Sequence, residues 1–415
     1  MSKTDLENAK KILKKYNQEH LLNFYDKLSV NQKEILINQI LSIDFDEIFS
    51  LYDNSMTDNF PLTQKVSPLP YIDKCSLSKQ DVLFYDSIAE NVIKNNQFAV
   101  VTMAGGQGSR LGYKGPKGTY MLNLKPVKKS LFQIMCEDLK RANEKYDVTI
   151  PWFVMTSDEN DVATKSFFEI NNFFDYPKDY IFFFKQGKLP IISVKRNLLL
   201  QEPYLIREAA NGNGNVFASM KNDGVLDVMM RLGIKWISFG GIDNVLLQNV
   251  DTLFLGLTIF SKNQIASKSI FKETPMEKTA VYCRKDGKPA ILDYTDISLE
   301  LSESKDDNGN YLYRDANMLS HLMSIDAVNK VADISLPYHR AFKKNAFVND
   351  EGVKQVPDSP NVFKFENFIF DAFYFFDDML LLRVDADREF APIKDFTGKF
   401  NPDSAIEKYL GVFGG

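Results

Sequence analysis

A glycine-rich loop directly after a short apolar run is the feature that most restricts the fold of this chain. The run FAVVTM, from Phe98, has the length of a buried strand, and AGGQGSRLGYKGPKG follows it from Ala104 to Gly118. Glycines let backbone N–H groups approach an oxyanion closely, and Arg110 and Lys117 add positive charge. A loop of this composition after a strand predicts a phosphate site at the edge of an α/β sheet. The alternative is a tight glycine turn with solvated basic residues.

The spacing of the glycines excludes two common phosphate loops. A dinucleotide fingerprint requires G-x-G-x-x-G, whereas Gly106, Gly108 and Gly112 are one residue too widely spaced. A Walker A loop requires G-x-x-x-x-G-K-[ST], and no segment of the sequence matches it. The loop therefore disfavours an NAD-linked oxidoreductase.

Strands alternate with helices from Gln97 onward, which predicts an α/β fold with helices on both faces of a parallel sheet. The expected strands are FAVVTM, WFVMTS, IFFFKQ and KWISFGG, and the expected helices between them include LFQIMCEDLKRA, capped by Ser130, and VLDVMMRLG. A helix is also expected to start near Asp158. The later run AVYCRKDGKPAILDYTDIS predicts a hairpin that turns at Asp286 and Gly287.

The first 60 or so residues predict helices, with a capping box formed by Ser29 and Gln32. A proline-punctuated linker from Asn59 is expected to run over the surface before a helix at about Lys79–Lys94. We accordingly divide the chain into an N-terminal helical region with its linker (1–95), a central domain (96–380) and a short C-terminal region (381–415).

Composition limits the possible partners and location. The 415 residues carry a net charge of -5, so no overall basic field draws in nucleic acid. No apolar leader or stretch of transmembrane length is found, which predicts a cytoplasmic protein without membrane contact. Cys75, Cys136 and Cys283 lack metal-ligand spacing and are expected to be buried thiols.

Six segments in order resemble motifs of the UDP-sugar pyrophosphorylase (UDPGP type 1) family, most closely its UDP-N-acetylglucosamine pyrophosphorylase branch. The glycine loop matches the family pattern L-A-G-G-x-G-T-R-L-G-x-x-x-P-K-G, with Ser109 in place of Thr. Arg110 favours the N-acetylhexosamine branch over the UDP-glucose branch. The resemblance runs from about Tyr71 to the C-terminus through FFKQGKLP, NGNGNVF, GGIDNVL, a P-x-E run followed by the hairpin, and EFAPIKD.

The resemblance implies a Rossmann-like nucleotidyltransferase (GT-A-like) with a mixed, mostly parallel sheet. The implied reaction joins UTP and a sugar 1-phosphate, which by branch is N-acetylglucosamine 1-phosphate, into a UDP-sugar and pyrophosphate, with Mg²⁺. The attacking phosphate is already ionised, so no general base is needed, in keeping with three histidines that lie outside the motifs, His20, His321 and His339. Alternatives are a UTP–glucose-1-phosphate uridylyltransferase, a broad-specificity UDP-sugar pyrophosphorylase, or a non-catalytic nucleotide-sugar sensor.

Carried over position by position, the resemblance assigns Arg110, Lys117 and Lys394 to the phosphates as catalytic residues and Asp243 to the metal ion. Retention of these four residues favours an enzyme over a sensor. The residues assigned to the nucleotide are Ala104, Gly105, Gly106, Gly108, Gln186 and Gly212, and those assigned to the sugar are Asn213, Asp293, Tyr294 and Asn317.

Simpler roles remain open for several of these positions. Lys394 could be a solvated loop lysine, Asp243 a helix cap and Gln186 a polar strand end, and the sugar candidates could be turn or hairpin residues. Asp293 stands where the family usually has Glu, and Ala280 where Gly is common. The choice of sugar, the oligomeric state and the physiological direction therefore stay open.

Overall fold

The computed structural model describes residues 3–57, 65–275, 277, 279–294 and 297–414. The chain forms two compact units, each assembled from separated segments. The small unit comprises Met1–Pro61, Gly187–Asn215 and Leu336–Phe368, and the large unit comprises Leu62–Gln186, Val216–Ser335 and Ile369–Gly415. This division differs from the consecutive regions 1–95, 96–380 and 381–415, which stay a prediction.

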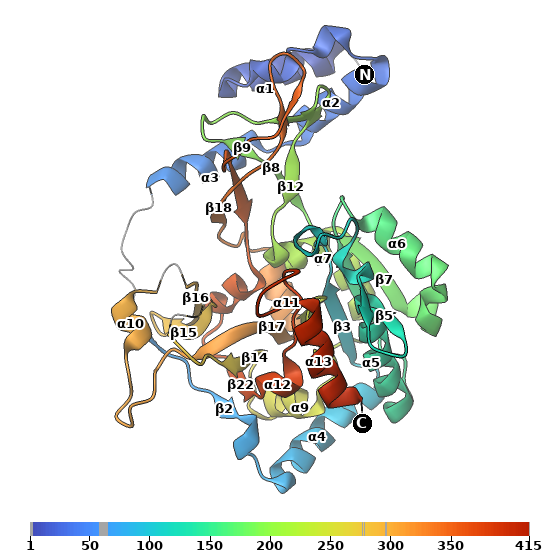
Figure 1. The fold of residues 1–415 in the computed structure, drawn as a ribbon, viewed down its shortest axis with the longest axis vertical. Coiled ribbons are helices and arrows are strands. Elements are labelled where there is room, and N and C mark those ends of the chain that lie inside the picture. Colours follow the sequence, from blue (N-terminus) through green and yellow to red (C-terminus); the bar gives the residue numbers. More distant parts are fainter. Residues whose placement is uncertain (1–2, 58–64, 276, 278, 295–296, 415) are drawn as a thin grey trace. The chain divides into compact units, whose positions relative to one another are not determined.

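The small unit joins N-terminal helices to short strands (Figure 1). Its helices are α1 (Lys3–Tyr16), α2 (Val30–Ser42) and α3 (Phe45–Thr57), and the predicted capping box of Ser29 and Gln32 opens α2. Leu36 and Ile40 of α2 share a buried cluster with Leu198 and Phe365 from the other two segments. The strands are β8 (Lys188–Pro190), β9 (Ile192–Ser193), β10 (Leu200–Glu202), β11 (Leu205–Ile206), β12 (Glu208–Ala210), β18 (His339–Lys343), β19 (Phe347–Val348), β20 (Lys354–Gln355) and β21 (Val362–Glu366).

A mixed, mostly parallel sheet forms the centre of the large unit, as predicted, in the order β2-β22-β14-β17-β13-β3-β6-β7. Along this path β17 runs antiparallel to both of its neighbours, and the remaining pairs are parallel. The strands are β2 (Ile72–Asp73), β22 (Leu380–Val384), β14 (Ile265–Phe271), β17 (Asp315–Ser324), β13 (Trp236–Gly241), β3 (Phe98–Met103), β6 (Trp152–Thr156) and β7 (Ile181–Lys185).

Helices cover both faces of this sheet. Phe98 and Val100 of β3 share one buried cluster with α4 (Lys79–Lys94), α5 (Leu131–Tyr146), α6 (Asp161–Ile170) and α9 (Thr252–Phe260). On the opposite face Phe239 of β13 packs against Phe217 of α7 (Val216–Asn222), and α11 (Ile325–Ala332) and α8 (Val225–Arg231) pack on α7. The expected helix near Asp158 starts at Asp161.

The predicted hairpin is confirmed as β15 (Val281–Lys285) and β16 (Lys288–Leu292). Asp286 and Gly287 at its turn both have positive φ, 50° and 81°, as a two-residue primed turn requires. The linker beyond Gln64 does more than run over the surface, because β1 (Val66–Pro68) pairs with β15 and β2 pairs with β22. The linker residues 59–64 lie outside the described residues.

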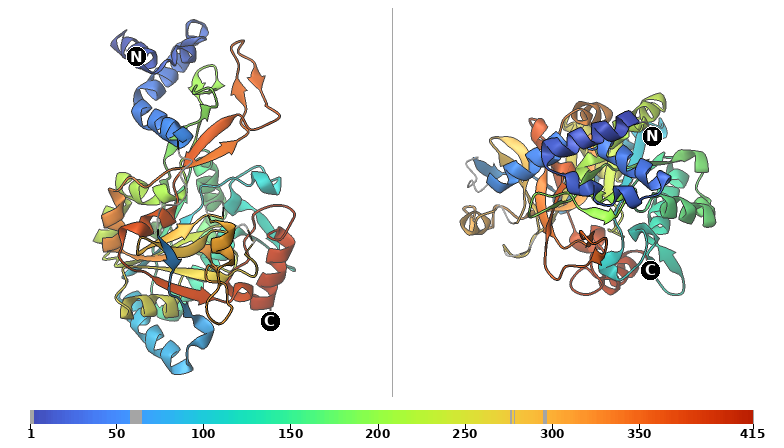
Figure 2. Two further views of the ribbon diagram at one scale, coloured as in Figure 1. Left: turned by 90° about the vertical axis from the view of Figure 1, so that its left-hand side faces the viewer. Right: turned by 90° about the horizontal axis from the view of Figure 1, so that it is seen from above.

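The remaining elements of the large unit are short, apart from α13, which lies on the outside of the unit in both views of Figure 2. They are β4 (Met121–Asn123), β5 (Lys128–Ser130), α10 (Leu299–Glu303), α12 (Ala386–Glu389) and α13 (Pro402–Phe413). Burial raises the pKa of the Cys136 and Cys283 thiols to about 12, whereas Cys75 is exposed, contrary to the prediction for that cysteine. Within the described ranges, no helix combines the length and apolar character needed to cross a bilayer.

Candidate active site

Four parallel strands, β13, β3, β6 and β7, end at the same edge of the large sheet. The segments that leave these ends contain the glycine loop, the TSDEN turn after β6, Gln186 and the Asp243–Asn244 pair. Ligands of open α/β sheets bind outside the carboxyl ends of the strands. Most of the residues assigned from sequence therefore meet where a substrate is expected.

The glycine loop is closed at its base by backbone hydrogen bonds. Gly108 N–H donates to the Gly115 carbonyl and Lys117 N–H to the Gly106 carbonyl, each at 3.0 Å. Gly112 ends the short turn Ser109–Leu111 with a φ of 65°, a conformation that favours glycine. The loop therefore forms a hydrogen-bonded, hairpin-like turn.

Two side chains that follow β6 orient the first peptide planes of the loop. Ser157 Oγ donates to the Gly105 carbonyl at 2.9 Å, and Asn160 Nδ2 donates to the carbonyls of Ala104 (2.9 Å) and Gly106 (3.3 Å). The N–H and C=O groups of one trans peptide point in opposite directions, so the N–H groups of residues 105–107 face away from the side chains of Ser157 and Asn160. These three N–H groups donate to no acceptor in the described part of the chain.

Sequence reasoning missed Ser157 and Asn160. The signal that could have found them is a polar cluster, TSDEN, directly after a buried strand and next to the phosphate loop in the sheet.

Gln186 lies directly against the glycine loop. Its backbone N–H donates to the Thr156 carbonyl at 2.9 Å, which holds the end of β7 beside β6. A Cβ added to Gly105 would come within 2.4 Å of Gln186 Nε2, so Gln186 occupies space that only glycine leaves open. Among the described residues its amide has no hydrogen-bond partner, so both its donor and its acceptor are available to a ligand.

Asp243 and Lys117 form an ion pair at this edge. Asp243 Oδ2 lies 3.4 Å from Lys117 Nζ, and both side chains are partly buried, with 25% and 12% of their area exposed. The alternative that Asp243 caps a helix is wrong, because the next helix, α9, begins at Thr252 and is capped by Asp251. The carboxylate therefore faces Lys117 of the glycine loop and has no role in helix formation.

Asn244 connects this position to the late segment that carries Lys394. Its Nδ2 donates to the Glu389 carbonyl at 2.8 Å, and its Oδ1 accepts from Ala391 N–H at 2.8 Å. Ile393 N–H in turn donates to the Asp243 carbonyl at 2.9 Å. Residues separated by almost 150 positions are thus bonded directly, which brings Lys394 to the carboxyl end of β13.

The loop around Lys394 also contacts the glycine loop. Lys394 N–H donates to the Phe400 carbonyl at 2.8 Å, and its ammonium lies 5.1 Å from the centre of the Phe400 ring. Phe396 N–H donates to the Arg110 carbonyl at 3.2 Å, and Arg110 lies 3.7 Å from the carboxylate of Asp395. Such an exposed pair contributes little, so the guanidinium can exchange Asp395 for an anionic ligand.

A buried charge cluster anchors the start of this segment. Lys268, which is 1% exposed, has its ammonium 2.5 Å from carboxylate oxygens of both Asp251 and Glu389. Lys74 adds a second ammonium 2.5 Å from Glu389. Burial lowers the pKa of Lys268, but the attraction of Asp251 and Glu389 outweighs it and raises the net pKa, so the lysine stays charged. The segment from Glu389 to Lys394 is therefore fixed at several points.

The sugar candidates of the large unit lie on the hairpin side. Asn317 N–H donates to the Ala280 carbonyl at 2.9 Å, so these two positions are adjacent. Asn317 Oδ1 accepts from Leu319 N–H at 2.9 Å and from the Tyr282 hydroxyl at 3.1 Å, which leaves its amide N–H₂ for a ligand. Asp293 and Tyr294 follow β16, and the Tyr294 side chain is exposed.

Gly212 and Asn213 belong to the small unit, where Asn213 opens the short turn Asn213–Asn215. Gly212 has a φ of 97°, and a Cβ there would come within 2.1 Å of the Asn367 carbonyl oxygen. Local geometry in the small unit thus requires a glycine at this position, independently of any ligand.

The one histidine of the large unit takes no part in this arrangement. His321 is completely buried in β17, its Nδ1 lies 2.8 Å from Ser267 Oγ, and burial lowers its pKa to about 3. His20 and His339 belong to the small unit. From the residues of the large unit, the edge with the glycine loop therefore offers charge neutralisation and hydrogen bonding, and no histidine for acid–base chemistry.

Comparison with known proteins identifies the family. Residues 45–405 match the family described as UTP–glucose-1-phosphate uridylyltransferase, which covers most of the chain. The chain belongs to this family. Members of this uridylyltransferase family are nucleotidyltransferases, so the chain is one too, and a dinucleotide-dependent oxidoreductase is excluded.

Individual relatives in the uridylyltransferase family point to one branch. The chain is 35% identical to the UDP-N-acetylglucosamine pyrophosphorylase of Saccharomyces cerevisiae, over 83% of this chain and 75% of the relative. It is 31% identical to UDP-N-acetylglucosamine diphosphorylase 2 of Arabidopsis thaliana, over 95% of this chain and 81% of the relative. The solved structure of the uridine diphosphate N-acetylglucosamine pyrophosphorylase from Trypanosoma brucei, in complex with an inhibitor, has a TM-score of 0.86 at 26% identity, covering 99% and 85% of the two chains.

Proposed function

We propose that this chain transfers a uridylyl group from UTP to N-acetylglucosamine 1-phosphate, which yields UDP-N-acetylglucosamine and pyrophosphate in the cytoplasm. The sugar is inferred from the relatives that share about a third of the sequence over most of its length. The observation that carries the proposal is the meeting of the glycine loop, Gln186, Asp243 and the Lys394 segment at one edge of the large sheet.

Uracil is the base that suits Gln186. The imide edge of uracil offers a donor between two acceptors, and the free amide of Gln186 offers one acceptor and one donor. The available N–H groups of Gly105 and Gly106 supply further donors beside it. Ala104 and Gly108 shape the same loop.

The chemical difficulty is the meeting of two polyanions. At about 4 Å, two like charges repel by roughly 4 kcal/mol at an effective dielectric constant of 20. An ionised oxygen of the sugar phosphate attacks the α-phosphorus of UTP, the bond to the bridging oxygen breaks, and pyrophosphate leaves. Arg110 and Lys117 bind the triphosphate and neutralise charge on the leaving pyrophosphate, and Lys394 neutralises charge near the reacting phosphorus.

Mg²⁺ fits this set of groups. The described residues contain no cluster of three or more His, Cys, Asp or Glu that could hold a metal, but Mg²⁺ at phosphate sites uses one or two carboxylates, substrate oxygens and water. Asp243 supplies such a carboxylate, and an unneutralised carboxylate there would repel a triphosphate. A bound Mg²⁺ would offset charge on the phosphate oxygens. With the metal on Asp243, Lys117, which pairs with Asp243 in this structure, would be available to bind the substrate phosphates.

The sugar is contacted from the hairpin side in this proposal. Asn317, Asp293 and Tyr294 are the candidates in the large unit. Glucose 1-phosphate is the second candidate substrate, because the matched family is described by that substrate.

The decisive test is pyrophosphate release from UTP with a panel of sugar 1-phosphates. We expect N-acetylglucosamine 1-phosphate to give a kcat/KM at least ~10-fold above those of glucose 1-phosphate and galactose 1-phosphate. Equal values would support a broad-specificity enzyme, and no release with any sugar would refute the proposal.

A further inference from the structure

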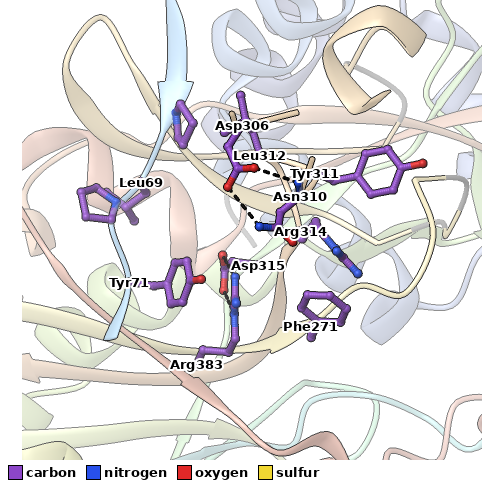
Figure 3. A pocket seen from close by; sticks show the side chains of 12 residues that line it. Leu69, Tyr71, Phe271, Asp306, Asn310, Tyr311, Leu312, Arg314, Asp315 and Arg383 are labelled. Carbon is purple, nitrogen blue, oxygen red and sulfur yellow. Dashed lines mark hydrogen bonds and ion pairs between the residues drawn. The ribbon is translucent and has the colours of Figure 1, made fainter. Parts of the chain in front are cut away.

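A cavity of about 460 Å³ opens on the large unit (Figure 3), and no residue of the glycine loop lines it. It lies beside β14, β22 and the segment before β2, whereas the glycine loop follows β3. β14 and β3 are three strand positions apart, and neighbouring strands lie about 4.8 Å apart, so the two regions are separated by roughly 14 Å in the plane of the sheet. None of the residues assigned above to UTP or the phosphates lines this cavity.

The cavity wall is a ladder in which aromatic rings alternate with guanidinium groups. Arg383 lies over the Tyr71 ring at 3.5 Å and within 5.4 Å of the Phe271 ring. Arg314 lies over the Phe271 ring at 3.4 Å and within 5.5 Å of the Tyr311 ring, and Figure 3 shows it between these two rings. Guanidinium groups stacked in this way are held flat and keep their edges free for ligands.

The two arginines differ in how their charge is balanced. Arg383 forms a bidentate pair with Asp315, at 2.9 and 2.8 Å. Arg314 donates only its Nε–H, to the Lys272 carbonyl at 3.1 Å, and no carboxylate lies within 4 Å of it in the described ranges. Burial and the neighbouring charge of Arg383 lower the pKa of Arg314, and the opposing attraction of Tyr311, Asp315 and Tyr71 does not offset them. Its two terminal nitrogens present the fork that binds phosphate.

The cavity also contains groups suited to sugar hydroxyls. Asp306 is held in place by N–H donors of Asn308 and Asn310, at 2.9 and 2.8 Å, and by the Asn310 amide at 3.2 Å. Its remaining lone pairs can accept from hydroxyl groups. Tyr71 and Phe271 are 46% and 43% exposed, and exposed aromatic rings pack well against the apolar face of a pyranose.

We propose that this cavity is a second binding site, for a sugar phosphate whose phosphate lies on Arg314 and whose hydroxyls face Asp306. The volume suits a ligand of that size, whereas inorganic phosphate alone would leave most of it empty. The site goes beyond the proposed transferase reaction and takes no part in its chemistry.

The site is connected to the sugar side of the active site by the backbone. Lys272 N–H donates to the Arg314 carbonyl at 2.8 Å, so the cavity wall holds the start of the segment that ends at Ala280. Arg314 is also three residues before Asn317 on β17. Occupancy of the cavity is therefore expected to change the KM for the sugar 1-phosphate more than the KM for UTP.

Glucose 6-phosphate is the probe, because its phosphate is not on the anomeric carbon and it cannot replace a sugar 1-phosphate as substrate. Its binding to the full chain is measured by isothermal titration calorimetry, with glucose and inorganic phosphate as separate ligands. The variants are Arg314→Gln, Arg314→Lys and Lys394→Ala. Arg141→Gln is the matched control, because Arg141 also stacks on a ring, that of Phe413, but is paired with Asp138.

We expect the wild type, Lys394→Ala and Arg141→Gln to bind glucose 6-phosphate alike, Arg314→Gln to bind at least ~10-fold more weakly, and Arg314→Lys to be intermediate. Circular dichroism melting verifies that each variant is folded. If Arg314→Gln does not fold, Tyr71→Ala provides a second test, and it is expected to bind glucose 6-phosphate more weakly than the wild type. The proposal is overturned if glucose 6-phosphate does not bind to the wild type at 10 mM, or if it binds to Arg314→Gln as tightly as to the wild type. It is also overturned if Lys394→Ala loses binding, because the ligand would then lie at the residues assigned to the substrate phosphates. Inorganic phosphate that binds as tightly as glucose 6-phosphate would overturn the assignment to sugar phosphates.

Discussion

The contact between Gly105 and Gln186 allows the role of Gln186 to be tested without changing Gln186 itself. A methyl group on residue 105 would lie 2.4 Å from Gln186 Nε2 and 2.7 Å from its Cδ, so the amide must move. The φ of Gly105 lies outside the left-handed region, so alanine is compatible with the backbone there. Because the displaced amide has no hydrogen-bond partner among the described residues, the free energy of unfolding should change by less than about 1 kcal/mol.

The expected loss in Gly105→Ala is the pair of hydrogen bonds between Gln186 and uracil. At about 0.5–1.5 kcal/mol for each bond, the loss is roughly 1–3 kcal/mol, or about 5- to 150-fold in kcat/KM for UTP. Pyrophosphate release at saturating sugar 1-phosphate measures it, with ATP as a competing substrate to record base selectivity. Gly106→Ala is the matched control for stability, because a Cβ there meets no protein atom within 4 Å.

The double variant Gly105→Ala/Gln186→Ala decides how the methyl group acts. If it acts by displacing Gln186, adding it to the Gln186→Ala background should change kcat/KM by no more than about twofold, so that the two effects are not additive. Full additivity would refute the reasoning, because the methyl group would then obstruct the nucleotide directly. Unchanged base selectivity in Gln186→Ala would refute the uracil-reading role itself.

Four further outcomes are expected. Lys394→Ala should lower kcat by ~10²-fold or more with an unchanged melting temperature, and an unchanged kcat would return Lys394 to a solvated-loop role. Asp243→Asn should lose most turnover and need more Mg²⁺ for half-maximal rate, and an unchanged Mg²⁺ titration would remove Asp243 from the metal site. Asn244→Ala should destabilise the fold by about 2–4 kcal/mol in urea unfolding, because it leaves the Glu389 carbonyl and the Ala391 N–H unpaired, and a change below about 0.5 kcal/mol would contradict the anchoring role. Burial lowers the pKa of His321 to about 3 in the folded state, against about 6.5 in the unfolded chain, so the unfolded state binds a proton first as the pH falls. The free energy of unfolding should therefore fall by about 1.6 kcal/mol between pH 6.5 and 5, and parallel pH slopes in the wild type and His321→Gln would contradict this.

The central sheet was predictable because its signals are local. Each buried strand is a short apolar run, and the carboxyl ends of parallel strands meet at one edge, so Gly105, Gln186 and Asp243 could be expected together. The capping box at Ser29 and the turn at Asp286 could also be predicted, because each depends on residues within four positions of one another.

Contacts between distant segments were not predictable from such signals. The sequence offered a helix cap as the simpler role of Asp243, and only the folded chain shows that its neighbour Asn244 binds residues 389 and 391. The strands at Val66–Pro68 and Ile72–Asp73 were not predicted because Pro68 ends the first strand and Pro70 lies between the two, and edge positions tolerate proline where central strands do not. The exposure of Cys75 likewise depends on the surroundings of a short turn, for which composition is no guide.

The composition of the small unit from three separated segments has a consequence for synthesis on the ribosome. Its N-terminal helices end at Thr57, but the last segment that completes their core ends at Phe368. At about 5–20 residues per second, the intervening chain takes roughly 15–60 s to be translated. During that time the apolar faces of α2 and α3 lack their final partners, so the nascent chain passes through a long period in which chaperones or transient packing must cover them.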